Sequence, residues 1–416
     1  MTIMDSTPRD VRHTQSPSTE RNSAELPTAN ELDFSLILGG PIFQLFRRSH
    51  LSGDGLELLH RRLLFITGIA WLPLLVLSIV GGHLTSGAGL PFLHDIEAHA
   101  RLLVALPMLI LAEVVVHRRL RPVVSAFLTR RIVVGPDVPR FVTAIQDAMK
   151  LRNSVPVELA LLLLIFTLGL WVWRSQIALG TSTWYAVVEN GQFRLTLPGY
   201  WYAFVSVPVF QFILLRWYLR LLIWFRFLWQ VARLNLQIIP THPDRAGGLG
   251  FLGKGAYAFG PILFAQGVLL SALIASRVLY GGAVLSSFRV EAGVVIGFFL
   301  LVILGPLAMF TPKLAEAKRR GLAQYGLLAS RYVEQFDRKW VGGGAAGDDE
   351  LLGTGDIQSL ADLGNGFAYV REMRAIPFGL DDVLRLAAAT AAPLVPLGLI
   401  VLSFEELVAQ LVKILF

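Results

Sequence analysis

Long apolar runs alternate with short polar segments along most of the chain, beginning near residue 62. A helix needs about 20 apolar residues to cross the hydrocarbon core of a bilayer, which is about 30 Å thick. Seven runs come close to that length, at residues 62–81, 101–117, 157–177, 201–223, 257–280, 291–311 and 385–403. The pattern therefore predicts an all-α fold, a polytopic transmembrane helix bundle with about seven spans.

The polar segments between these runs divide the chain into five predicted regions. They are a disordered cytoplasmic tail (1–30), an interfacial helix region (31–61), a transmembrane bundle of six spans (62–311) with a basic cytoplasmic loop (118–156), a cytoplasmic loop (312–384), and the last span with a C-terminal amphipathic helix (385–416). Within the basic loop, Val138, Phe141, Val142, Ile145 and Met149 recur at helical spacing, which predicts an amphipathic helix.

The loop at 312–384 contains the flexible stretch "GGGAAG" and then a second amphipathic segment at 356–378. This segment is either a solvated helix docked on the floor of the bundle or a surface that binds a partner.

Composition agrees with a membrane protein, because 54% of the residues are hydrophobic and only 16% are charged, whereas soluble domains have about 25% charged residues. The chain has no cysteine, which excludes disulfides, thiolate nucleophiles and cysteine-based metal sites. The net charge of +7 does not indicate nucleic-acid binding, because the basic residues are distributed between the apolar runs and form no continuous stripe.

The same basic residues predict the orientation. They concentrate before the first span, between the second and third, and after the sixth, so the positive-inside rule places the N-terminus in the cytoplasm, beside an anionic inner leaflet. The sequence leaves open whether the chain forms a homo-oligomer.

Two stretches, "PTHPDRAGGLGFLGKG" at 240–255 and "DIQSLADLGNGFAYVREMRAIPF" at 356–378, resemble recurring segments of uncharacterised bacterial multi-pass membrane proteins. The resemblance extends from about residue 35 to the end of the chain. It implies a multi-pass protein of the bacterial inner membrane, and it implies no activity and no catalytic residue.

Four arginines interrupt the apolar stretch at 212–234, namely Arg216, Arg220, Arg226 and Arg233. A helix that enters from outside near Tyr200 has used up the hydrocarbon core by about residue 220, because it rises about 1.5 Å per residue. Arg226 and Arg233 are therefore expected at or beyond the cytoplasmic interface. Arg216 and Arg220 either extend to that interface or lie buried, paired and able to line an anion site.

Charged residues on two other spans are predicted at a similar depth. Glu113 lies about 18 Å along the second span, His117 shares its helix face, and Glu158 enters with the third span from the cytoplasmic side. We hypothesise that Glu113, His117, Glu158, Arg216 and Arg220 form a polar cluster in the inner leaflet. The alternative is that each contacts lipid headgroups separately.

Two further segments carry candidate chemistry. His242, Asp244 and Arg245, in the glycine-rich loop after the fourth span, either form a structural turn or contact an anion, and the phosphate-loop pattern is absent. His94, Asp95 and His99 are weak candidates for a metal site, since an acid at a helix start is also favoured by the helix dipole. We predict no bound cofactor: the histidines that flank the first two spans lie at membrane edges, where histidine is common without haem.

Three functions are compatible with these patterns. A permease or channel for an anionic solute is favoured slightly over a membrane scaffold or sensor with a cytoplasmic docking surface. The third is an intramembrane enzyme that acts on a lipid-linked substrate, but the chain lacks a dense catalytic constellation, which argues against enzymatic activity.

Overall fold

The computed structural model of the protein describes residues 34–39, 59–86, 89–169, 182–189, 192–342 and 354–401. The predicted N-terminal tail, most of the predicted interfacial region, residues 170–177 of the third predicted span and the predicted C-terminal amphipathic helix lie outside these residues.

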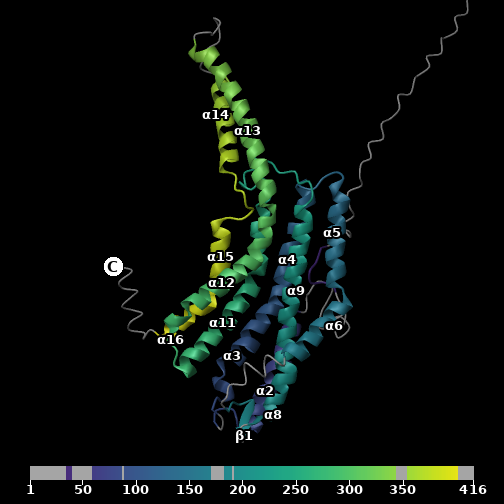
Figure 1. Ribbon diagram of the computed structural model, residues 1–416, viewed down its shortest axis with the longest axis vertical. Helices are drawn as coiled ribbons and strands as arrows, with labels where there is room; N and C mark the ends of the chain where they lie inside the picture. Colours follow the sequence, from purple (N-terminus) through teal and green to yellow (C-terminus); the bar gives the residue numbers. More distant parts are fainter. Residues whose placement is uncertain are drawn as a thin grey trace, which may run out of the picture.

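Helices form nearly all of the described chain (Figure 1). The longer ones are α2 (Leu59–Val80), α4 (Leu106–Thr129), α5 (Asp137–Arg152), α6 (Val155–Leu164), α9 (Val207–Ala232), α11 (Gly260–Gly281), α12 (Arg289–Leu304), α13 (Thr311–Phe336), α14 (Asp356–Glu372) and α15 (Leu380–Ala391). The short ones are α3 (Ile96–His99), α8 (Leu197–Trp201), α10 (Phe251–Ala256) and α16 (Val395–Val401). Two strands, β1 (Ala186–Glu189) and β2 (Gln192–Leu195), pair in antiparallel fashion.

Five helical stretches are long and apolar enough to cross a membrane: Leu59–Val80, Ile96–Thr129, Leu197–Ala232, Phe251–Gly281 and Leu285–Val341. A sixth results if α5 and the stretch Val155–Gly169, which meet at a bend of 45°, are counted as one span. The all-α class and a multi-pass membrane protein are thus supported, but seven spans are not confirmed. The last predicted span is divided into α15, a 3₁₀ turn (Ala392–Leu394) and α16. Pro393 and Pro396 each lack the N–H that a continuous helix needs there.

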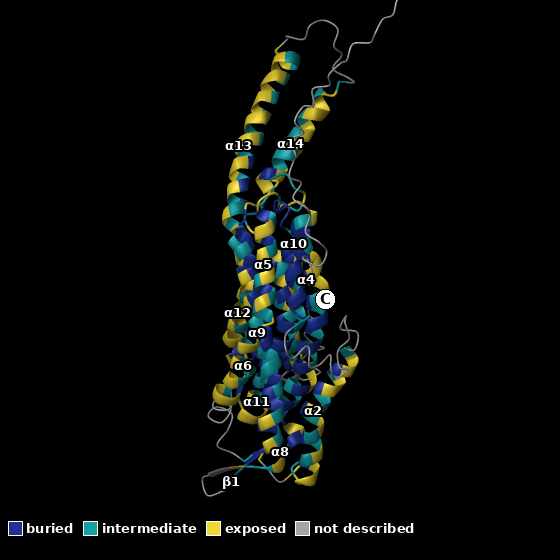
Figure 2. Cartoon of the chain, turned by 90° about the vertical axis from the view of Figure 1, so that its right-hand side faces the viewer, coloured by how far each residue is buried: buried dark blue, intermediate teal, exposed yellow. Residues whose placement is uncertain are grey.

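The core of the bundle lies around α9, which contacts α2, α4, α5 and α6. Trp217, Phe227 and Leu228 on this helix are fully buried. The N-terminal segment 34–39 packs on it as well: the Phe34 ring lies 5.0 Å from the Phe227 ring and 5.9 Å from the Trp224 ring, measured between centroids. Figure 2 shows the resulting buried column inside a shell of exposed residues.

The predicted cytoplasmic segment at 312–384 is largely helical, and it contains a long helix, α13, that the hydropathy pattern does not predict. Helix α13 runs for 26 residues, or about 39 Å, and α14 packs along it to form a hairpin that projects from one end of the bundle (Figure 1). Within the segment 356–378, α14 packs on α13, while Met373 and Phe378 after it pack against the core of the bundle. The cause lies in the composition of residues 311–336: its Ala, Leu, Glu, Lys and Arg residues all favour helix, but the charged ones among them lower the hydropathy.

The amphipathic helix predicted within the basic loop is present as α5. Its apolar face, with Phe141, Ala144 and Ile145 buried, packs against α9. The β1–β2 hairpin lies at the opposite end of the bundle, and the hydropathy pattern does not predict it (Figure 1).

Gly267 provides a test of how closely α11 and α15 approach one another. A Cβ atom at this position would lie 2.0 Å from the backbone oxygen of Thr390, so Gly267→Ala must separate the two helices. We expect the substitution to lower the free energy of unfolding by about 1–3 kcal/mol, measured as a lower Tm in detergent.

The matched control is Gly297→Ala in α12, where an added Cβ meets no heavy atom within 4 Å. Because glycine is unfavourable inside a helix, this variant should be unchanged or more stable by up to about 1 kcal/mol. Equal melting temperatures for the two variants would contradict the close packing of α11 on α15.

Candidate functional site

Four helices bring five charged side chains together inside the bundle. We call this set the arginine cluster, and it consists of Arg62 on α2, Glu113 on α4, Glu158 on α6, and Arg216 and Arg220 on α9. Their exposed fractions are 3%, 9%, 5%, 8% and 3% in that order. All five side chains are therefore buried inside the bundle.

Glu113 bridges two arginines. Its Oε1 atom accepts a hydrogen bond of 2.8 Å from Arg220 Nη1, and its Oε2 atom accepts one from Arg62 Nη2. The guanidinium of Arg220 also lies 4.7 Å from the centre of the Trp217 ring. This single carboxylate thus ties α2 and α9 to α4.

Arg216 forms the second part of the cluster. Its Nη2 atom lies 3.5 Å from Oε1 of Glu158 and donates a hydrogen bond of 3.4 Å to the backbone oxygen of Gly39. Of the two alternatives for Arg216 and Arg220, the structure shows the buried and paired one. Arg226, farther along α9, and Arg233, directly after its end, are exposed, and the Arg233 guanidinium stacks 3.8 Å from the centre of the Trp229 ring.

His117 lies one turn beyond Glu113 and contacts a different partner. Its Nδ1 atom is 2.9 Å from Oγ of Ser35, and the same hydroxyl accepts hydrogen bonds from the backbone N–H groups of Ile37 and Leu38. The histidine thereby helps to hold the segment 34–39 against the bundle. Arg62, by contrast, belongs to the cluster but was not among the predicted site residues.

The charges of the cluster do not balance within the described part of the chain. Three guanidinium groups meet two carboxylates there, which leaves one positive charge in excess. Burying an uncompensated charge in an apolar medium costs several kcal/mol, and an anion bound beside it would remove much of that cost.

A cavity of about 400 Å³ adjoins the cluster, and we call it the lateral groove. Three charged side chains line it, Arg62, Glu113 and Arg216, and all its other lining residues are apolar. The apolar residues are Phe65, Ile66, Ile69, Ile110, Leu162, Ile165, Phe166, Phe204, Val205, Pro208, Val209, Phe212 and Ile213. The volume lies within the range of small-molecule sites.

The predicted site residues of the loop after α9 form a separate structure. Asp244 accepts hydrogen bonds from the backbone N–H groups of Ala246, Gly248 and Gly250, at 2.8, 3.1 and 2.8 Å, and Nδ1 of His242 lies 2.9 Å from its Oδ1 atom. The amides that could have held an anion are thus occupied by the chain's own carboxylate. This geometry favours the structural turn among the two alternatives.

The loop also joins the bundle to the α13–α14 hairpin. Arg245 lies 3.0 Å from Glu372 at the end of α14, and its backbone oxygen accepts a hydrogen bond of 2.7 Å from the N–H of Arg374. Gly247 has a positive φ of 63°, and a Cβ there would lie 2.2 Å from the Ile238 side chain. The loop is therefore closely packed, and its contacts hold the α13–α14 hairpin on the bundle.

Two of the three weak metal candidates, Asp95 and His99, are engaged in other contacts. Asp95 accepts hydrogen bonds from the N–H of Ala98 and from Nε1 of Trp184, both at 2.9 Å, while His99 accepts one from Trp71 and donates one to the backbone oxygen of Phe92. No group of three or more His, Cys, Asp or Glu side chains that could hold a metal ion occurs among the described residues.

No protein-family model matches the chain, and no curated protein or solved structure matches it either. The resemblance of its two stretches to uncharacterised bacterial membrane proteins stays a prediction, and function must be inferred from the site itself.

The bridging role of Glu113 can be tested by Glu113→Gln, which leaves Arg62 and Arg220 buried without their carboxylate. Removing one partner of a buried ion pair costs about 3–5 kcal/mol, so we expect a large drop in Tm in detergent. The double variant Glu113→Gln/Arg220→Gln should recover part of the loss, because the two sites are coupled.

The control for this experiment is Glu316→Gln on α13, whose ion pair with Arg320 is exposed, at 3.6 Å. Exposed pairs contribute about 0–1 kcal/mol, so this variant should melt close to the unchanged protein. If Glu113→Gln melted equally high, Glu113 would not hold the bundle together.

The hydrogen bonds of the Asp244 carboxylate predict that the stability of the fold depends on pH. Burial alone would raise its pKa, but the three backbone N–H groups and His242 outweigh this, and the pKa lies below the ordinary value of 3.8. A lowered pKa in the folded state means that the ionised carboxylate stabilises the fold above pH 3.8, and that this contribution is lost as the pH falls through the lowered pKa.

Asp244→Asn should therefore melt at a lower temperature than the unchanged protein at neutral pH, by the equivalent of about 1–3 kcal/mol, and the two curves of Tm against pH should converge in acid. A constant difference from neutral pH down to pH 3 would contradict this assignment.

Proposed function

We propose that the chain is a multi-pass protein of a bacterial inner membrane, with its N-terminus in the cytoplasm, that binds an anionic solute at the arginine cluster and acts as a permease or channel for it. The observation that carries the proposal is the excess positive charge of the cluster within the described residues, buried beside a cavity of about 400 Å³. Charged groups within membrane spans are costly and typically mark substrate or ion pathways.

The arginines are well suited to this role. A guanidinium group offers several N–H donors in one plane and stays charged even when it is desolvated, so it recognises carboxylates and phosphates in preference to neutral solutes. Arg62 and Arg216 both line the cavity, whereas Arg220 does not and pairs with Glu113 behind them. Two arginines can therefore contact a solute while the third fixes Glu113.

A membrane scaffold or sensor is the second candidate, and the α13–α14 hairpin favours it. The hairpin projects beyond the bundle and exposes apolar side chains, among them Leu327, Leu328 and Ile357. On the proposed topology it extends into the cytoplasm, next to the anionic inner leaflet. The third candidate, an intramembrane enzyme, gains no support, because Glu113 and His117 are engaged in separate contacts.

The transport proposal can be tested in proteoliposomes loaded with phosphate or with short-chain carboxylates. Vesicles that contain the unchanged protein should release at least one of these anions faster than empty vesicles. Arg216→Gln should reduce that flux by about tenfold or more, equivalent to about 1.4 kcal/mol of binding free energy, and Arg216→Lys should retain part of it.

Arg226→Gln is the matched control, since Arg226 lies on the same helix but is exposed, and its flux should stay near that of the unchanged protein. Flux that is absent from the unchanged protein would reject transport and leave the scaffold. Equal flux for Arg216→Gln and Arg226→Gln would place the pathway elsewhere.

A further inference from the structure

We propose that the lateral groove is a binding site for one anionic phospholipid of the inner leaflet, with the phosphate on Arg62 and Arg216 and one acyl chain along the apolar lining. This assignment rests on the proposed binding of an anion at the arginine cluster, and it names the class of ligand. It does not depend on transport.

The first support is the separation of charged and apolar residues along the length of the groove. On α2, α4 and α9, which supply its charged lining residues, the apolar residues lie on the side of the charged residue that faces the middle of the membrane in the proposed topology. They follow Arg62 on α2 as Phe65 to Ile69, and on α9 and the turn before it they precede Arg216 as Phe204 to Ile213. On α4, as on α9, the apolar residue Ile110 precedes the charged residue Glu113 along the chain. The groove thus has one charged end and one apolar end.

The length and depth of the groove match one leaflet. From Phe204 to Arg216 is 12 residues, or about 18 Å of helix, and half of the hydrocarbon core is about 15 Å thick. The charged end lies toward Arg226 and Arg233, the exposed arginines at which α9 is proposed to leave the membrane. An inner-leaflet lipid has the same orientation, with its headgroup at the cytoplasmic interface and its chains toward the midplane.

The groove is open to the side of the bundle. Phe65, Ile69, Phe166 and Phe204 line it and are also exposed, at 48%, 37%, 49% and 51%. In a membrane these faces meet lipid, so an acyl chain can enter from the bilayer without crossing a polar barrier. A small hydrophilic anion would leave most of this apolar lining without a partner.

The charge of the site selects among lipids. A phosphodiester carries one negative charge, which equals the excess positive charge of the cluster in the described residues. A zwitterionic lipid adds a cation beside Arg62 and Arg216 and therefore gains less. We accordingly infer that the headgroup is anionic overall, as in phosphatidylglycerol.

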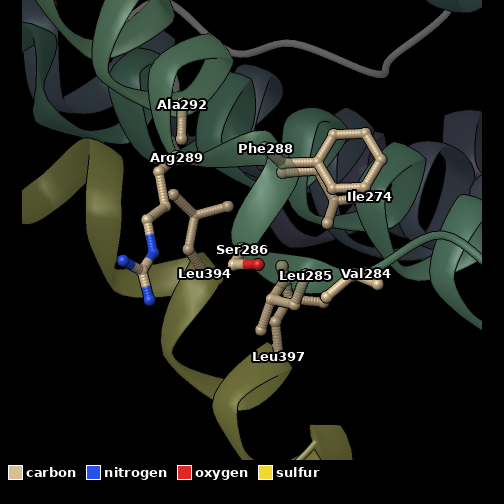
Figure 3. Close-up of a pocket in the computed structure, with 9 residues that line it drawn as sticks. All are labelled: Ile274, Val284, Leu285, Ser286, Phe288, Arg289, Ala292, Leu394 and Leu397. Atoms are coloured by element: carbon tan, nitrogen blue, oxygen red, sulfur yellow. The ribbon is translucent and has the colours of Figure 1, made fainter.

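A second cavity serves as an internal comparison. It also has a volume of about 400 Å³ and lies between the end of α11, the start of α12 and α16, lined by Ile274, Val284, Phe288 and Leu397 among others (Figure 3). Its one charged lining residue, Arg289, is exposed and forms no ion pair with a buried carboxylate among the residues that the structure describes. Both cavities thus have a similar volume with a largely apolar lining. Of the two, the lateral groove is the one that adjoins a buried excess of positive charge.

The proposal is tested by native mass spectrometry of the delipidated full chain in neutral detergent. Phosphatidylglycerol, phosphatidylcholine, palmitate and inorganic phosphate are added separately. We expect one phosphatidylglycerol to be retained, at least tenfold more tightly than phosphatidylcholine or phosphate. Arg216→Gln should abolish this preference, and Ile69→Trp, which fills the groove away from the charges, should abolish lipid binding but leave phosphate binding.

The matched controls are Arg289→Gln and Val284→Trp in the second cavity, and both should retain phosphatidylglycerol. Should Arg216→Gln fail to fold, Ile69→Trp and Val284→Trp decide the question between them, because neither alters a charge. Equal retention by these two tryptophan variants would overturn the proposal.

The remaining outcomes separate this proposal from the proposed function. Phosphate binding that depends on Arg216, together with no preference for phosphatidylglycerol, overturns the lipid site and leaves the anion site standing. Palmitate retained more tightly than phosphatidylglycerol overturns the assignment to a phospholipid. If none of the four probes binds, the proposed lipid site and the proposed anion site are both overturned.

Discussion

Compensation of charge inside an apolar bundle is the constraint on which the structure depends. In hydrocarbon, Arg62, Arg220 and Glu113 cannot be hydrated, so each must find a partner of opposite charge. The hydrogen bonds from both arginines to the two oxygens of Glu113 satisfy that need. They also fix the relative height of α2, α4 and α9, because a shift of one helical turn, about 5.4 Å, would separate the partners. Apolar packing alone would tolerate such a shift more readily, since neighbouring turns of these helices are similarly apolar.

Much of this arrangement follows from the sequence, because the rise of a helix is constant. Counting residues from the outer end of each span placed Glu113 at the depth of the α9 arginines and separated Arg216 and Arg220 from Arg226 and Arg233, and the burial of these four follows the same division. The count could not decide which acid pairs with which arginine, as that depends on how the helices are rotated and on their neighbours. Glu113 pairs with Arg220, and Arg216 with Glu158. Arg62 was missed since it stands beside Arg61 at the start of a span, where basic residues ordinarily report orientation.

Other features of the fold could not be predicted from the hydropathy pattern, each for a different reason. The β1–β2 hairpin had a local signal, Asn190–Gly191 between short β-branched and aromatic stretches, but a two-stranded ribbon of four-residue strands is easily outweighed by spans on either side. Helix α13 is polar enough to resemble a loop by hydropathy, although its helix-forming residues favour the observed state. In the loop after α9, the sequence shows amides and a carboxylate, and only the fold shows that Asp244 turns back onto those amides.

The excess charge distinguishes the arginine cluster from a purely structural network. Buried ion pairs are poor stabilisers, because well-packed apolar side chains of similar size often hold helices together as well or better. In a cluster that served stability alone, a third guanidinium group adds a buried charge without a carboxylate of its own, whereas a cluster that receives an anion needs such a surplus. The described residues show the surplus next to a cavity that is apolar everywhere else. A ligand with one negative charge and a hydrocarbon chain satisfies both properties at once, and a free inorganic anion satisfies only the first.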